Sequence, residues 1–233
     1  MIELDRVRYR FAEMEMSFIL SVAPATFAAV IGPSGGGKST LLALIAGFLV
    51  PAGGTIRLAG VDMAGVPPAR RPVSMVFQDH NAFAHLDVWR NVALGLSPSL
   101  RLDGEQRKLV DGALERVGLK ALAHRLPGEV SGGERQRIAI ARALVRDRPI
   151  LLLDEPLAAL GPALRTDMIA LLRDVQRERR LTVLMVTHDP EEARRAASHT
   201  AFLADGRILA YGKTGRLLAR HDLPELASYL GKT

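Results

Sequence analysis

The residues best suited to chemistry form a glycine-rich segment that ends in a lysine and two hydroxyl side chains. Residues 32–40 read Gly-Pro-Ser-Gly-Gly-Gly-Lys-Ser-Thr, match the pattern G-x-x-x-x-G-K-[ST] and follow an apolar run over 27–31. The glycines allow backbone N–H groups to surround a phosphate chain, and the N-terminus of the following helix attracts negative charge. In this pattern Lys38 reaches the terminal phosphates and the Ser39 hydroxyl binds Mg²⁺. Residues 32–40, the phosphate loop, therefore predict nucleotide binding.

Two adjacent acidic residues follow a second apolar run. Residues 150–153 read Ile-Leu-Leu-Leu and lead directly into Asp154 and Glu155. Such a run is typical of a buried parallel strand, and open α/β sheets bind ligands at the carboxyl ends of their strands. Adjacent side chains on an extended chain point in different directions, so we expect Asp154 to face Mg²⁺ and Glu155 to face the water that attacks the γ-phosphate. The alternative is a solvated strand end, which the phosphate loop upstream disfavours.

A second phosphate-binding element is predicted near Ser131. Residues 130–134 read Val-Ser-Gly-Gly-Glu and open a helix, so Ser131 can cap it while the exposed backbone N–H groups attract an anion. Taken alone, this short pattern is more typical of an ordinary helix cap. Together with the phosphate loop, it gives one chain two phosphate sites far apart in sequence, and a single nucleotide need not reach both.

Strands that alternate with helices must position these residues. Strands are expected at residues 2–11, 16–22, 27–31, 55–58, 73–77, 150–153 and 182–186. Helices are expected at residues 38–49, 88–96, 106–117, 119–125, 131–145 and 163–179, from 190 onward, and near 217, with a hairpin through 205–206. This alternation predicts an α/β fold with a parallel sheet and right-handed crossovers.

Composition excludes several classes of protein. The chain has 233 residues, 48% of them hydrophobic, which is enough for a sizeable core and is too apolar for a disordered chain. The absence of cysteine excludes disulfides, cysteine-ligated metal sites and thiol catalysis. The longest apolar run, residues 41–50, is about half of what a membrane span needs, and no secretory signal is expected at the N-terminus. The net charge of +6 suits phosphates or lipid headgroups but specifies neither.

Five motifs in this order resemble those of the ATP-binding subunits of ABC transporters. They are the phosphate loop, Gln78 at the end of a strand, residues 130–137 (VSGGERQR), residues 150–156 (ILLLDEP) and a strand followed by Thr-His-Asp at 187–189. The resemblance covers essentially the whole chain. It implies an α/β P-loop NTPase core with an N-terminal antiparallel β subdomain and a helical insert at about 79–140, all in one ABC ATP-binding domain over residues 1–233. It also implies a head-to-tail dimer of two copies, which would account for the two phosphate sites.

The resemblance further implies a role for each motif position. The residues that bind ATP would be Phe11, Gly32, Ser34, Gly35, Gly37, Lys38, Ser39 and Thr40 of one copy, with Ser131, Gly132, Gly133 and Glu134 of the other. Ser39, Gln78 and Asp154 would bind Mg²⁺. Glu155 would be the general base, His188 the γ-phosphate sensor, and Gln78 would also position the attacking water. We expect Phe11 to stack on adenine, with Tyr9 as the alternative, although either ring could instead belong to the core.

Two departures from the family pattern affect these expectations. Gly161 stands where the family usually has an aspartate that contacts the opposite phosphate loop, so we expect looser coupling between the two sites or a weaker ATP-bound dimer. The second motif has Val130 for leucine and Glu134 for glutamine. We expect Glu134 to be tolerated, because an acid in the first turn of a helix interacts favourably with the helix dipole.

The resemblance also implies partners and a location. A separate integral membrane permease is expected, with a periplasmic solute-binding protein acting indirectly through it. The chain would lie at the cytoplasmic face of a bacterial inner membrane as a peripheral subunit. In this family the permease docks just after Gln78, here near Phe83, His85, Leu86, Val88 and Trp89. The alternative for Trp89 and its neighbours is that they fill the core of the helical insert.

Three segments resemble, more narrowly, the ATPase subunits of bacterial importers for thiamine or thiamine pyrophosphate. They are residues 48–56 (FLVPAGGTI), 67–78 (PPARRPVSMVFQ) and 125–133 (RLPGEVSGG). None of these residues would contact the cargo, so iron(III), polyamine, sulfate and molybdate stay open as alternatives. A soluble ATPase acting on nucleic acid is less favoured, and no nucleic-acid partner is expected, because the arginine-rich stretch at 173–180 lacks interleaved aromatic residues. A purely nucleotide-sensing protein would not need Glu155 and His188.

Overall fold

The computed structural model describes residues 1–78, 82–158 and 160–231, and all strands of this part belong to one sheet. The order across the sheet is β5-β4-β1-β2-β10-β9-β3-β8-β7-β6. The strands are β1 (Ile2–Phe11), β2 (Met14–Val22), β3 (Phe27–Ile31), β4 (Gly53–Leu58), β5 (Val61–Asp62), β6 (Val73–Val76), β7 (Ile150–Asp154), β8 (Thr182–Val186), β9 (His199–Ala204) and β10 (Arg207–Lys213). The α/β fold class expected from the sequence is confirmed.

The parallel half of the sheet is buried on both faces. β3 lies between β8 and β9 and is parallel to both, and β7 lies between β6 and β8. All residues of β3, β7 and β8 are buried, which explains why these strands read as continuous apolar runs. Alternate residues of β3 point into two different cores: Phe27, Ala29 and Ile31 into one, Ala28 and Val30 into the other.

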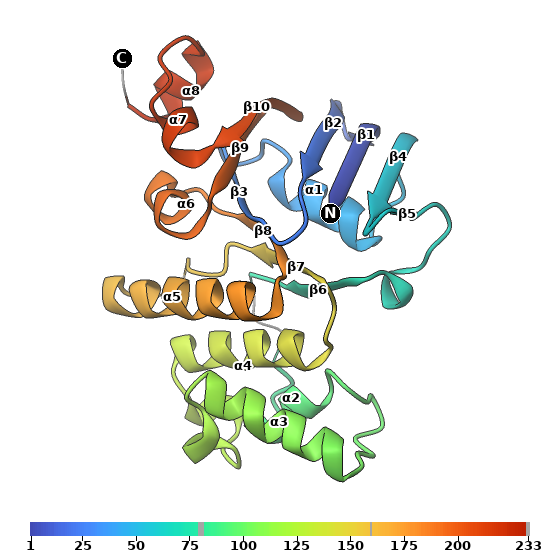
Figure 1. Cartoon of the computed structure of the whole chain (residues 1–233), viewed down its shortest axis with the longest axis vertical. Coiled ribbons are helices and arrows are strands. Elements are labelled where there is room, and N and C mark those ends of the chain that lie inside the picture. Colours follow the sequence, from blue (N-terminus) through green and yellow to red (C-terminus); the bar gives the residue numbers. More distant parts are fainter. Residues whose placement is uncertain (79–81, 159, 232–233) are drawn as a thin grey trace.

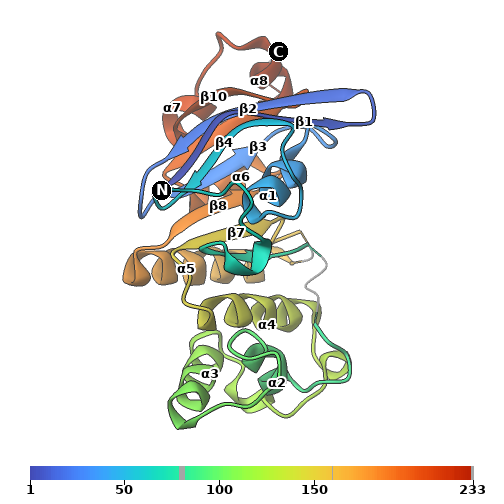
Figure 2. The same ribbon diagram turned by 90° about the vertical axis from the view of Figure 1, so that its right-hand side faces the viewer.

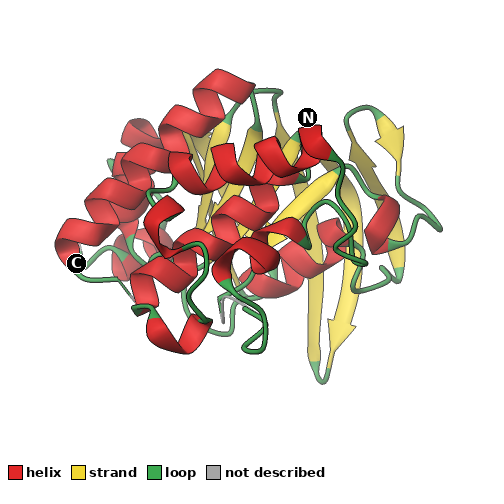
Figure 3. Cartoon of the chain, turned by 90° about the horizontal axis from the view of Figure 1, so that it is seen from below, coloured by secondary structure: helices red, strands yellow, loops and turns green. Residues whose placement is uncertain are grey.

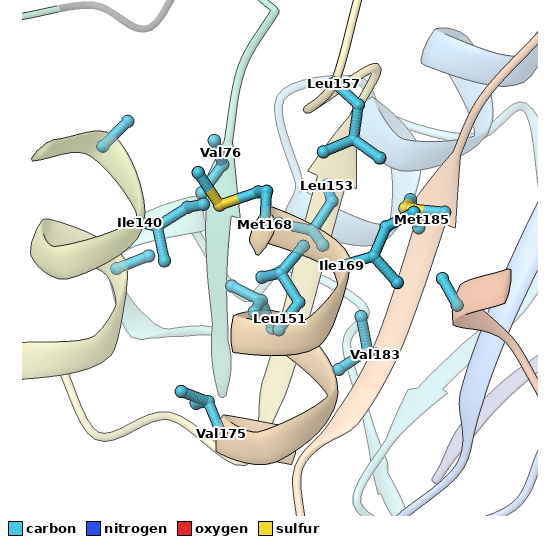
Figure 4. Close-up of a cluster of buried hydrophobic side chains, with 14 of the residues drawn as sticks. Val76, Ile140, Leu151, Leu153, Leu157, Met168, Ile169, Val175, Val183 and Met185 are labelled. Carbon is cyan, nitrogen blue, oxygen red and sulfur yellow. The ribbon is translucent and has the colours of Figure 1, made fainter. Parts of the chain in front are cut away.

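Helices cover both faces. α1 (Lys38–Ala46) packs on the face that also carries the antiparallel strands. α5 (Pro162–Arg179) and α6 (Pro190–Ala196) cover the opposite face (Figure 1). Figure 4 shows this second core: Met168 and Ile169 of α5 lie over Leu151 and Leu153 of β7, beside β8. The helices on the two faces pack against β3 and β7, and the carboxyl ends of these parallel strands lie at one edge of the sheet.

The antiparallel strands form one end of the molecule. β1 pairs with β2 and β4, and an irregularity after Leu4 shifts the register. β2 meets β10 through the single pair Ser17–Arg207, which joins this end to the parallel half. In Figure 3 these strands project beyond the helices at one side.

The segment between β6 and β7 contains helices and no strand among its described residues. It contains α2 (Val88–Ala93), α3 (Gly104–Arg116) and α4 (Gly132–Val145), with α4 between α3 and α5 in Figures 1 and 2. The expected helix at 88–96 ends earlier, and that at 119–125 is one 3-10 turn, Lys120–Leu122. Val88 is fully buried, while Trp89 packs against the core and its Nε1 donates to Asp111 Oδ1 at 2.7 Å. Val88 therefore fills the core of the insert, and the half-buried Trp89 packs on that core, while permease docking near Trp89 stays a prediction.

The C-terminal region follows the expected hairpin through Asp205 and Gly206. α7 (Thr214–Leu218) lies where a short helix was expected. A further helix, α8 (Pro224–Tyr229), was not anticipated; Leu226, at its centre, is fully buried. Within the described residues, no helix is both long and apolar enough to cross a membrane.

Candidate functional site

The phosphate loop connects β3 to α1, and Gly32 and Gly37 within it have backbone angles that would strain any other residue. At Gly32 φ is +150°, and an added Cβ would lie 1.8 Å from the carbonyl oxygen of Leu203 on β9. At Gly37, the N-cap of α1, φ is +104°. The loop is also held from the β9–β10 hairpin, because Gly206 N donates to Gly36 O at 3.0 Å. The chain therefore turns sharply from a buried strand into a helix whose N-terminus faces the loop.

Lys38 is the first residue of α1 and is buried. Its Nζ donates to Gly32 O at 2.9 Å and Pro33 O at 2.8 Å, so the side chain folds back along the loop. Burial lowers the pKa of Lys38, and the negative charges of Glu155 and Asp154 oppose this shift. The ammonium group is thus placed between the loop backbone and the acids at the end of β7.

Asp154 and Ser39 meet across the site. Ser39 Oγ donates to Asp154 Oδ1 at 3.1 Å, which links the start of α1 to the end of β7. The pKa of Asp154 is raised, chiefly by burial, while the Ser39 hydrogen bond acts in the other direction. Two neighbouring oxygen ligands suit Mg²⁺, which takes its remaining ligands from phosphates and water. Among the described residues, no cluster of three or more His, Cys, Asp or Glu could hold a metal ion.

Glu155 and His188 form the second pair. Glu155 has the left-handed backbone angle φ +44°, and its N–H donates to Val186 O at 3.0 Å. Its Oε2 lies 3.0 Å from Nδ1 of His188, which follows β8. Because an ionised carboxylate only accepts hydrogen bonds, Nδ1 carries the hydrogen whenever Glu155 is ionised. The turn after β7 thus directs Glu155 away from Asp154 and toward the end of β8.

One cavity of about 500 Å³ brings many of the expected residues together. Its lining consists of residues 11–14 and Met16 from the β1–β2 hairpin, Ser34, Gly35, Gly37, Lys38, Ser39 and Thr40 from the phosphate loop, and Glu155. Phe11 lies at its rim with a ring that is 66% exposed, whereas Tyr9 lines a different hollow together with Arg207. The geometry favours Phe11 over Tyr9 as the residue beside a bound base.

The other expected site residues lie outside this cavity lining. Gln78 is exposed just beyond the end of β6, and the three residues after it are outside the described part of the chain. Ser131 caps α4 in a reciprocal arrangement with Glu134, whose Oε2 accepts from Ser131 N at 2.7 Å and Oγ at 2.8 Å. These bonds lower the pKa of Glu134. Glu134 is therefore part of the cap, and Gly132 and Gly133 form the first turn of α4.

Residues without a motif also contribute to the site. Arg165 of α5 donates from Nε to Leu160 O at 2.8 Å and lies 3.4 Å from Glu192 through Nη1, so it links the loop after Glu155 to α6. Tyr229 of α8 donates to the backbone carbonyl of His188 at 2.6 Å. No local pattern marks either residue, because the contacts of Arg165 with Glu192 and of Tyr229 with His188 join segments distant in sequence. Met14 and Met16 could have been found, since Met14 pairs with Phe11 and Met16 with Tyr9 across the β1–β2 hairpin, and both methionines line the cavity.

Comparison with known proteins places this geometry in a family. Residues 16–158 match the family model described as ABC transporter. The chain is 52% identical to "Thiamine import ATP-binding protein ThiQ" of Mesorhizobium japonicum over 230 residues, which cover 99% of this chain and 91% of that protein. It is also 52% identical to the protein of the same name from Salmonella typhimurium over 219 residues, which cover 94% and 93%.

Solved structures agree with the sequence relatives. A dimeric post-hydrolysis state of the ATP-binding cassette MJ0796, bound to ADP and Pi, aligns with a TM-score of 0.81 and 31% identity over 92% of this chain and 99% of that one. The structure of cbiO1 from Clostridium perfringens, part of the ABC transporter complex cbiONQ, aligns with a TM-score of 0.84 and 27% identity, over 94% and 90%. With the phosphate loop, the Asp154–Glu155 pair and His188 assembled on this fold, the chain belongs to the ABC transporter family of ATP-binding subunits.

Proposed function

We propose that this chain is the ATP-hydrolysing subunit of an importer that takes up thiamine or thiamine pyrophosphate through a separate membrane permease. The observation that carries the ATPase function is the cavity in which the phosphate loop faces Glu155, itself in contact with His188. The cargo is supported by the names and the 52% identity of the relatives, which extends over almost the whole chain.

The bound nucleotide would lie along the phosphate loop. Backbone N–H groups at the start of α1 and the Lys38 ammonium would neutralise the phosphate oxygens. Phe11, exposed at the rim, would stack on adenine. Ser39 and Asp154, already in contact, would hold Mg²⁺, and Gln78 would complete its ligands; when bound, the ion supplies charge neutralisation at the phosphate oxygens.

Hydrolysis would depend on the Glu155–His188 pair. Glu155 would accept the proton of the attacking water, since its carboxylate lines the cavity next to the phosphate loop. With its Nδ1 hydrogen directed at Glu155, the imidazole of His188 can donate from Nε2 to a phosphate oxygen only when the ring is doubly protonated. Glu155 and His188 are therefore suited to keep the proton taken from the attacking water close to the phosphate oxygen that gains negative charge.

A second copy of the chain would complete the site. Ser131, Gly132, Gly133 and Glu134 lie at the N-terminus of α4 and outside the cavity of their own chain, so their proposed ATP contacts require a partner. The relative of known structure bound to ADP and Pi is a dimer. We propose one ABC ATP-binding domain per chain, with the helical segment of α2–α4 as its insert.

The permease would dock beside this insert, at the cytoplasmic face of a bacterial inner membrane. A groove of about 190 Å³ lies between β6 and α4, and its lining includes Met75, Phe77 and Arg142. Phe83, which is 47% exposed, lies under the Arg142 guanidinium at 5.8 Å. A periplasmic binding protein would act only through the permease, and no nucleic-acid partner is proposed.

Uptake of labelled thiamine at nanomolar concentration tests this function. Source cells lacking the gene should lose uptake, the native chain should restore it, and Lys38→Ala should not. Restoration by Lys38→Ala would contradict the requirement for ATP binding. If uptake is unchanged when the gene is lost, thiamine is excluded as the cargo, and the neighbouring permease should be assayed with iron(III), polyamines, sulfate and molybdate.

A further inference from the structure

The last helix of the described chain is anchored beside the catalytic edge of the sheet. In Figure 1, α8 lies at the same end of the molecule as α7 and β9. Leu226 is fully buried in the core, and Leu223 and Leu230 pack against it. The ring of Tyr229 packs on Phe202 of β9, with centroids 5.5 Å apart and planes inclined by 43°. Because both ends of α8 contact the core, the Tyr229 side chain has a defined position.

The hydroxyl of Tyr229 reaches the backbone of His188. It donates to the His188 carbonyl oxygen at 2.6 Å, a contact between residues 41 positions apart. The pKa of Tyr229 is raised, first by burial and also by the charges of Asp189 and Glu155, while a hydrogen bond with the backbone of Gly32 acts in the other direction. The hydroxyl therefore stays protonated at neutral pH and keeps its capacity to donate.

The rest of the His188 segment is fixed on either side. Before it, Thr187 Oγ1 donates to the buried Glu192 of α6. After it, Asp189 caps α6 by accepting from Glu191 N at 2.8 Å. The peptide that joins His188 to Asp189 lies between these anchors, and its carbonyl is the group that Tyr229 holds.

We propose that Tyr229 is a positioning residue for ATP hydrolysis: by holding the His188 carbonyl, it orients the segment so that the imidazole meets Glu155. The inference rests on the proposed function, because it assumes that Glu155 and His188 act in hydrolysis. It gives α8 a role in the rate of the chemical step, although Tyr229 itself touches no reacting atom. The same peptide is also held by its N–H, because Asp189 N donates to Thr187 Oγ1 at 3.1 Å, so loss of the hydroxyl removes one of two restraints on the backbone that carries the imidazole.

The first test is Tyr229→Phe in the purified full chain. This change removes the hydroxyl and keeps the ring that packs on Phe202. We expect the kcat of Mg·ATP hydrolysis to fall about fivefold to tenfold, the loss that one hydrogen bond can produce, while the KM for ATP stays within about twofold. Tyr211→Phe is the matched control, because Tyr211 is also half-buried but stacks on His199 instead. An unchanged kcat for Tyr229→Phe would overturn the proposal.

A second measurement separates positioning from general stability. In the His188→Ala background, single-turnover hydrolysis of labelled ATP should be no slower with Tyr229→Phe than without it. An equal loss in both backgrounds would show that Tyr229 acts independently of His188, and would overturn the proposal. If Glu155→Gln hydrolyses ATP at the native rate, the proposed function itself fails; if Glu155→Gln is inactive and Tyr229→Phe is native-like, only the inference about Tyr229 fails.

A third readout does not depend on activity. In ¹⁵N-histidine-labelled protein, the Nδ1 resonance of His188 can be assigned from its loss in His188→Ala. We expect this resonance to shift in Tyr229→Phe and not in Tyr211→Phe, because the contact with Glu155 at 3.0 Å is altered. An unmoved resonance would overturn the proposal even if the rate fell.

Discussion

Replacing the buried Arg71 by methionine should destabilise the fold while leaving the catalytic residues in place. The Arg71 side chain donates to four backbone carbonyls: Nη1 to Leu44 O and Ile45 O at 2.8 Å, Nε to Val66 O at 3.0 Å, and Nη2 to Met63 O at 3.3 Å. Leu44 and Ile45 lie in the last turn of α1, where carbonyls lack full intrahelical partners. Arg71 therefore caps the helix that begins at the phosphate loop.

The expected loss follows from these four bonds. Ile45 O and Val66 O have no other donor among the described residues, and each costs about 1.5 kcal/mol, near the low end of the usual range because a cavity of about 490 Å³ beside Arg71 admits water. Leu44 O and Met63 O also accept from Gly47 N at 3.2 Å and Val66 N at 3.1 Å, so each loses only about 0.5 kcal/mol. Burial lowers the pKa of Arg71, so its charge is held at a desolvation cost, and removing that charge recovers on the order of 1 kcal/mol. The net destabilisation is about 3 kcal/mol, or about 6–12 °C in Tm for a chain of this size.

Urea unfolding checks this value. The single tryptophan, Trp89, reports on the helical insert by fluorescence, and far-UV circular dichroism reports on the whole fold. Arg70→Met is the matched control, because Arg70 is the exposed neighbour of Arg71. If the free energies of unfolding of the two variants differ by less than about 1 kcal/mol, the reasoning from buried carbonyls is refuted.

Three further substitutions test the site. Glu155→Gln should keep ATP affinity and slow hydrolysis by at least about 100-fold, because an amide cannot accept the proton of water; a rate within tenfold of native would contradict the general-base role. Gly161→Asp should fold normally, since φ is −69° and among the described residues no atom beyond its chain neighbours lies within 4 Å of an added Cβ. It should raise the Hill coefficient of ATP hydrolysis, and an unchanged coefficient argues against looser coupling in the native chain. For Asp154→Asn we expect a pH-dependent change in the stability of the fold. Burial raises the pKa of Asp154 above its ordinary value of 3.8, so ionisation destabilises the native chain as pH rises from 3.8 through the raised value. In urea titrations the variant should therefore be more stable than the native chain at pH 7, with this advantage vanishing below pH 3.8, and Mg²⁺-dependent hydrolysis should be lost. Lower stability of the variant at pH 7 would refute the burial argument.

Local patterns predicted most elements because the physics that forms them is local. The run at 150–153 is apolar throughout because β7 is buried on both faces. Gly32, Gly35 and Gly37 of the phosphate loop have backbone angles that other residues avoid. The main misses also have local causes. α8 has only six residues, too few to show a helical period, and the 3-10 turn at Lys120–Leu122 has the same difficulty.

By itself, the sequence determined which residues could do chemistry and the type of element on which each lies. It did so because a phosphate loop, an acid pair after a strand and a helix cap are each encoded within a few consecutive residues. Only the tertiary structure decided which of them meet: Ser39 with Asp154, Glu155 with His188, and Tyr229 with the His188 backbone. These contacts depend on the order of strands in the sheet, with β3 between β8 and β9. That order is set by burial of both apolar faces of the sheet against helices drawn from distant parts of the chain, and no short segment encodes it.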